Sequence, residues 1–106
     1  MKKEELYYAF QNALLFNITY HTRLIYADVL DGNKLVIWVH LDKEPNENEK
    51  DVYYSVSAEL TGSFEELNDS LSEVHFSTGN FNEEDLNGKL LLFARCDYLD
   101  LDGNLK

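Results

Sequence analysis

The chain has a single cysteine, Cys96, so it cannot form a disulfide within itself, and this fits a reducing compartment. No apolar run approaches the length of a membrane span, and the first residues, MKKEELYY, lack the apolar core of a signal peptide. With 106 residues the chain is long enough to bury a core that needs no disulfide bond for stability. We therefore expect one domain, residues 1–106, located in the cytoplasm and not in a membrane.

Basic residues are also scarce. Nine Lys and Arg stand against twenty Asp and Glu, which gives a formal net charge of −11. Four acids and four bases balance within residues 1–41, so the whole excess lies from Asp42 onward, where sixteen acids face five bases. Direct binding to nucleic acid is disfavoured because phosphate contacts require Lys and Arg. The charge favours a basic protein partner, although acid also serves simply to keep a small protein in solution.

A β-hairpin organises the chain. The runs TRLIYADVL and KLVIWVHL flank Asp31-Gly32-Asn33, and such a pair of apolar runs around Asp-Gly predicts a hairpin because the turn needs positive φ. Alternation along the two runs separates two faces. We expect the core face to carry Leu24, Tyr26, Leu30, Leu35, Ile37, Val39 and Leu41, with Asp28 among them. We expect the opposite face to carry Arg23, Ile25, Ala27, Val29, Val36, Trp38 and His40.

Two segments have helical spacing. Residues 4–16 place apolar side chains on one stripe, with Glu4 and Glu5 at the end that favours acids. Residues 51–60 are ambiguous, because VYYSVS has strand propensity and also alternates. Pro45, two acids before the segment and Gly62 after it favour a helix over residues 47–61.

The sequence therefore predicts an α+β fold in the order α-β-β-α-β-β. Strands are expected at about 20–30, 34–42, 73–77 and 89–97, with two helices packed on one face of a mainly antiparallel four-stranded sheet. No internal repeat and no linker divides the chain.

No catalytic or metal site is predicted, and no cofactor is expected. His21, His40 and His75 lack a second ligand at metal spacing. Cys96 lies in an apolar run, where cysteine behaves as a small hydrophobe. The terminal DLDGN resembles part of a calcium loop but has no downstream Glu.

The acidic residues form three groups in loops or at element ends, which are common places for binding function. Trp38, beside Ile25, Val36 and His40, is the best apolar anchor, since Trp is enriched at binding hot spots. The alternatives are solvated turns and a sheet covered on both faces, and a homodimer through the Trp38 face is possible. The predicted partner-binding residues are Asp42, Glu44, Glu47, Glu49, Glu65, Glu66, Asp69, Glu83, Glu84, Asp85 and Trp38, with Asp51 also in the first group.

Arg23 and Arg95 each lie inside an apolar strand. A buried guanidinium requires a carboxylate partner. We expect Glu59, on the second helix, or Asp28, on the hairpin, to provide it in structural ion pairs.

Several stretches resemble a known family: FQNALLFNIT, RLIYAD, KLVIWVHLDKEP, the later EVHF and GKLLLFAR. They are similar to small acidic immunity proteins of bacterial polymorphic-toxin and contact-dependent growth inhibition loci. The resemblance covers about residues 6–95, and its marks include Arg23, Glu59 and Arg95. It implies an α/β inhibitor of a cognate toxin and supports the helix at 51–60, but it does not identify the toxin.

The functional hypothesis is a non-enzymatic immunity protein whose acidic loops occlude the active site of a basic, nuclease-type toxin domain. The alternative is a phage-type anti-defence protein that mimics nucleic acid and inhibits a host nuclease complex. A small enzyme would require a pocket with convergent titratable groups, for example His40 and His75 with an acid.

Overall fold

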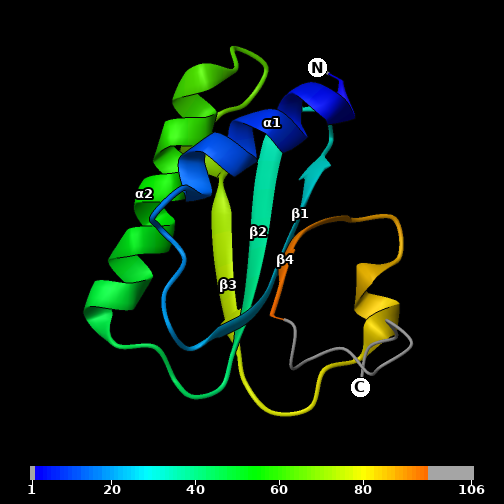
Figure 1. Cartoon of the computed structure of the whole chain (residues 1–106). Helices are drawn as coiled ribbons and strands as arrows, with labels where there is room; N and C mark the ends of the chain where they lie inside the picture. The colour runs from blue at the N-terminus through cyan, green and yellow to red at the C-terminus, as the bar shows by residue number, and fades with distance from the viewer. Residues whose placement is uncertain (1, 96–106) are drawn as a thin grey trace.

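The computed structural model describes residues 2–95 (Figure 1). Both helices lie on the same side of the sheet, and a connection of residues 78–89 leads from the third strand to the fourth. The elements are α1 (Lys3–Leu14), β1 (Thr22–Leu30), β2 (Lys34–Leu41), α2 (Glu47–Ser63), the short 3₁₀ helix η1 (Asp69–Leu71), β3 (Glu73–Ser77), a second 3₁₀ helix η2 (Glu83–Leu86) and β4 (Leu90–Ala94).

The four strands form one sheet in the order β3-β2-β1-β4. β1 is antiparallel to both β2 and β4, while β2 and β3 are parallel. The parallel pair follows from the helical crossover, because α2 carries the chain back along the sheet before β3 begins. The predicted α+β fold, with its order α-β-β-α-β-β, is confirmed. Residues 96 and 97 of the predicted last strand, including Cys96, and the DLDGN tail lie outside the described residues.

The hairpin turn corrects the expected faces of β1. Asp31 and Gly32 both have positive φ, at 55° and 77°, as the Asp-Gly signal predicts. However, Leu30 pairs with Lys34, so three residues separate the paired positions rather than two. This extra residue reverses which side of β1 matches the core side of β2. Ile25 therefore lies opposite Val39 on the core face, and Tyr26 lies opposite Trp38 on the other.

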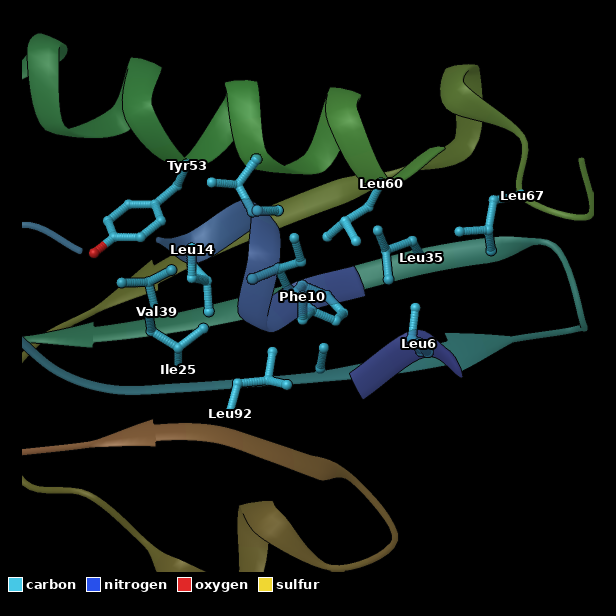
Figure 2. Packing of buried hydrophobic residues seen from close by; sticks show 14 of the residues in the cluster. Leu6, Phe10, Leu14, Ile25, Leu35, Val39, Tyr53, Leu60, Leu67 and Leu92 are labelled. Carbon is cyan, nitrogen blue, oxygen red and sulfur yellow. The ribbon is translucent and has the colours of Figure 1, made fainter. Parts of the chain in front are cut away.

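The core lies between the helices and one face of the sheet (Figure 2). α1 contributes Leu6, Phe10 and Leu14, and α2 contributes Tyr53 and Leu60. These side chains pack on Ile25, Ala27, Leu35, Ile37, Val39, Leu41 and Leu92 from the sheet. Burial of this continuous apolar set is the main stabilising contribution to the fold.

α2 includes residues 51–60, whose sequence is compatible with either a helix or a strand. The side chain of Asn46 accepts a hydrogen bond from the backbone N–H of Glu49 at 2.8 Å, which caps the helix. Glu47 and Glu49 occupy the first turn, where the helix dipole favours acids. These start signals and the packing of Tyr53, Val56 and Leu60 outweigh the strand propensity of VYYSVS, so the predicted helix is confirmed.

The second face of the sheet carries a row of rings. Tyr26 stacks on Trp38, with centroids 5.2 Å apart, and Trp38 lies 6.3 Å from His75 on β3. The connection of residues 78–89 covers part of this face, where Phe81 contacts both Tyr26 and His40. The expected alternative of a sheet covered on both faces therefore holds around Trp38.

Candidate protein-binding surface

An ion cluster joins three strands at one end of the sheet. Asp42 follows β2 and accepts two hydrogen bonds from the guanidinium of Arg95, at 2.7 and 3.0 Å. The Nε of Arg23 lies 3.2 Å from the same carboxylate. The hydrogen bond from Arg95, together with the charges of Arg95 and Arg23, lowers the pKa of Asp42. Asp42 is therefore held as an anion by its own chain.

This cluster corrects the expected ion pairs. Arg23 and Arg95 do form ion pairs, but their carboxylate partner is Asp42 rather than Glu59 or Asp28. Glu59 is exposed on α2, and the Asp28 carboxylate accepts a hydrogen bond from the backbone N–H of Val29. The backbone N–H of Arg95 also donates to the carbonyl of Arg23, at 2.8 Å, so the pairing continues one step past β4.

The rest of the first acidic group lies at the start of α2. Glu44 and Asp51 are exposed, and Glu47 lies 3.6 Å from Lys50 in a surface ion pair. Glu49 differs, because its carboxylate accepts a hydrogen bond from the Thr19 hydroxyl at 3.0 Å. This bond ties the start of α2 to the connection between α1 and β1.

The second acidic group lies at the opposite end of α2. Glu65 and Glu66 are exposed, and Asp69 accepts a hydrogen bond from the Thr61 hydroxyl at 2.8 Å. The backbone N–H of Glu66 lowers the pKa of its own carboxyl. At a rise of about 1.5 Å per residue, the helix places this group about 25 Å from the first.

The third acidic group, Glu83, Glu84 and Asp85, lies in η2. This 3₁₀ helix belongs to the connection whose Phe81 and Lys89 contact Tyr26 and Trp38 on the sheet face opposite the helices. Burial and the charge of Asp85 raise the pKa of Tyr26. The three acidic groups therefore lie on separate parts of the fold: at the start of α2, beyond its end, and in η2.

Trp38 packs mainly against its own chain. It is half-buried, and its ring lies between those of Tyr26 and His75. The Lys89 ammonium lies 5.2 Å from the centre of the Trp38 ring. Ile25, expected beside Trp38, points to the core instead. Trp38 as a binding anchor stays a prediction, but these contacts give the ring a structural role.

The apolar surface that the sequence did not predict lies in the connection between α1 and β1. Leu15, Phe16, Ile18 and Tyr20 are exposed, at 62%, 98%, 38% and 88%. We call these four side chains the loop patch. Between them, Thr19 turns inward: its backbone N–H donates to the Tyr53 hydroxyl at 3.0 Å. A run of exposed apolar residues in a pinned loop is a feature of binding surfaces.

The histidines are the residues that a catalytic or metal site would most readily use. The His40 ring is buried between the Ser77 hydroxyl and the Gly79 carbonyl, both at 2.9 Å. His75 is exposed and lies 2.8 Å from the Glu73 carboxylate. Within residues 2–95, no group of three His, Cys, Asp or Glu side chains is arranged to hold a metal ion. Nor does that part of the chain contain a helix long and apolar enough to cross a membrane.

Comparison with known proteins gives one family. The profile of the MafI2 immunity protein family matches residues 3–97, which is most of the chain. A search of curated proteins found no match. The match covers both helices, all four strands and the loop patch.

Proposed function

Because this chain belongs to the MafI2 immunity protein family, and so is a non-enzymatic inhibitor of a cognate Maf toxin, we propose that this toxin is a nuclease. The observation that carries the proposal is the charge distribution. The entire excess of −11 lies from Asp42 onward, and most of the acids within residues 42–95 are exposed. A nuclease must be basic where it holds phosphates, so an acidic inhibitor matches that surface.

We further propose occlusion as the mechanism. Exposed carboxylates on the inhibitor occupy the positive groove in which the toxin would hold its substrate, so the substrate cannot enter. Opposite fields also speed association, which matters when each unbound toxin molecule can damage the cell. Such a nuclease meets its nucleic acid in the cytoplasm, and we propose that the inhibitor acts there.

The test uses the cognate Maf toxin. Its toxic domain is assayed on DNA and on RNA, alone and with increasing amounts of the purified immunity protein. We expect cleavage that stops at one equivalent of inhibitor, and an association rate that falls steeply as salt rises from 50 to 500 mM. A toxic domain that is neutralised but cleaves neither nucleic acid would contradict the nuclease proposal.

The same purified proteins distinguish the immunity function from the anti-defence alternative. An anti-defence protein would inhibit a host nuclease complex and leave the Maf toxin active. Membership in an immunity family supports the first function.

A further inference from the structure

We propose that the loop patch, with the acidic start of α2 beside it, is the face that docks on the cognate toxin domain. The inference rests on the proposed function only in that it takes the toxin to be basic at the contact. The argument combines the exposure of the patch, its attachment to α2 and the charge next to it.

Two aromatic residues of the patch are almost fully exposed. Phe16 is 98% exposed and follows the end of α1 with a φ of 66°, a position that glycine or asparagine normally takes. A bulky side chain there strains the backbone and contributes almost no burial. Tyr20 is 88% exposed only four residues later. The Tyr20 ring meets the ring of the adjacent His21 edge-on, with centroids 5.2 Å apart, and most of its surface stays open to a partner.

The patch is held in place, which lowers the entropic cost of binding. Thr19 bonds to Tyr53 through its backbone N–H and to Glu49 through its hydroxyl, at 3.0 Å each. Asn17 closes the end of α1, since its side-chain amide donates to the Ala13 carbonyl at 2.9 Å. Ile18 and Tyr20 therefore point outward from a connection fixed at both ends.

Acidic residues adjoin the patch. The backbone N–H of Asp42 donates to the His21 carbonyl at 2.9 Å, so the segment that leads to Glu44 starts beside the residue that follows Tyr20. Glu49 is joined to Thr19, and Glu47 lies less than one helix turn away, 87% exposed and 3.6 Å from Lys50. In contrast, the ion cluster of Asp42 is internally neutralised by Arg23 and Arg95. An apolar centre with an acidic rim fits an apolar pocket rimmed by Lys and Arg.

The area required also fits this side of the molecule. A stable contact needs about 800 Å² from each partner, more than the loop patch alone provides. Tyr8 lies about two helix turns before Leu15, so both side chains project from the same side of α1, and Tyr8 is 69% exposed. Six of the ten exposed large apolar residues within residues 2–95 lie between Tyr7 and Tyr20. The outer face of α1 therefore extends the patch.

The experiment measures the affinity of the full chain for the purified cognate toxic domain by calorimetry. The double variant Phe16→Ala/Tyr20→Ala is expected to bind at least about 30-fold more weakly, as for two central hot-spot residues. Leu71→Ala is the matched control, because Leu71 is 40% exposed in η1, away from the patch, and should bind like the wild type. Thermal unfolding of each variant checks that the fold is retained.

Two double variants, each of which neutralises two acidic residues, test the acidic rim. Glu44→Gln/Glu47→Gln should slow association at low salt several-fold, whereas Glu83→Gln/Glu84→Gln on η2 should change it less. Equal slowing by both pairs would mean that only the overall charge matters and would overturn the proposed rim.

Hydrogen exchange on the wild-type complex gives a readout that needs no variant. Protection is expected at residues 15–20 and 44–51. Protection confined to η2 or to the Trp38 face, or unchanged affinity of the double variant, would overturn the docking face while leaving the neutralisation of the toxin intact. A wild-type dimer that the double variant abolishes, without loss of toxin affinity, would show the patch to be a self-interface instead. Failure of the wild-type chain to bind the toxin at all would contradict the proposed function as well.

Discussion

Arg95 and Asp42 lie 53 residues apart in the sequence and meet in a two-pronged hydrogen-bonded ion pair, with both N–O distances at or below 3.0 Å. Arg23, on the strand between them, joins the same carboxylate. One carboxylate therefore holds β1, the end of β2 and the end of β4 together. These contacts give Asp42 a structural role, and its role in partner binding stays a prediction.

Asp42→Asn should lower the free energy of unfolding by about 1–2 kcal/mol, a value kept modest because the carboxylate is one-third exposed. The amide cannot balance two guanidinium groups. Chemical denaturation at neutral pH measures the loss. Asp51→Asn, an exposed acid on α2, is the control and should change stability by less than about 0.5 kcal/mol. Equal effects of the two substitutions would contradict the structural role of Asp42.

The same ion cluster predicts how the stability difference depends on pH. The pKa of Asp42 is lowered in the folded chain, so its stabilising contribution is complete above the unfolded value of about 3.9 and is lost as the pH falls through the folded value. The difference in free energy of unfolding between the wild type and Asp42→Asn should therefore be constant from pH 5 to 7. It should begin to narrow below about pH 4. Unfolding curves across this range measure the gap. A gap that widened on acidification would contradict the assignment.

Tyr53→Phe should destabilise the protein by about 1–3 kcal/mol. The Tyr53 hydroxyl is buried and bonds to both Thr19 and Thr22, so its removal leaves polar groups without that partner in the interior. For a domain of this size the midpoint of thermal unfolding should fall by about 4–8 °C per kcal/mol. Tyr54→Phe, next along the helix and half-exposed, is the control and should leave the midpoint nearly unchanged.

Local signals were sufficient for the order of elements. Asp31-Gly32 predicted the hairpin, and Pro45 with the acids after it predicted α2. These features act on neighbouring residues, so their effect can be inferred from spacing alone. The faces of β1 could not be inferred in this way. They depend on whether the loop separates the paired residues by two positions or by three, and this one-residue difference exchanges Ile25 and Tyr26 between core and outer face.

The candidate site was harder to predict for a different reason. Sequence reasoning assigns apolar residues to the core by default, so Phe16 at the end of an amphipathic helix was expected to be part of that helix. Its exposure depends on α1 ending at Leu14 and on Thr19 being drawn to α2. Likewise, the partner of Arg95 depends on which strand ends meet, which is a long-range property.

Trp38→Ala should reduce stability more than it reduces toxin binding. The ring stacks on Tyr26 and His75 and lies beneath Lys89, so its removal leaves a gap on the outer face of the sheet. We expect a loss of about 2–3 kcal/mol, below the value for a fully buried Trp because this ring is half-exposed. Denaturation and calorimetry on the same sample separate the two effects. A large loss of affinity with stability unchanged would restore Trp38 as the binding anchor.

Phe16→Gly should change stability and binding in opposite directions. Glycine adopts a φ of 66° without strain, and the lost side chain is 98% exposed, so the free energy of unfolding should rise by about 0.5–1 kcal/mol. Affinity for the toxin should fall at the same time, because the most exposed side chain of the loop patch is gone. Thermal unfolding and calorimetry measure the two quantities. Leu15→Gly is the contrast: Leu15 has a negative φ of −58°, so glycine there should lower stability. A Phe16→Gly chain that is less stable than the wild type would mean that Phe16 contributes to folding, and the reason for assigning it to the toxin contact would be lost.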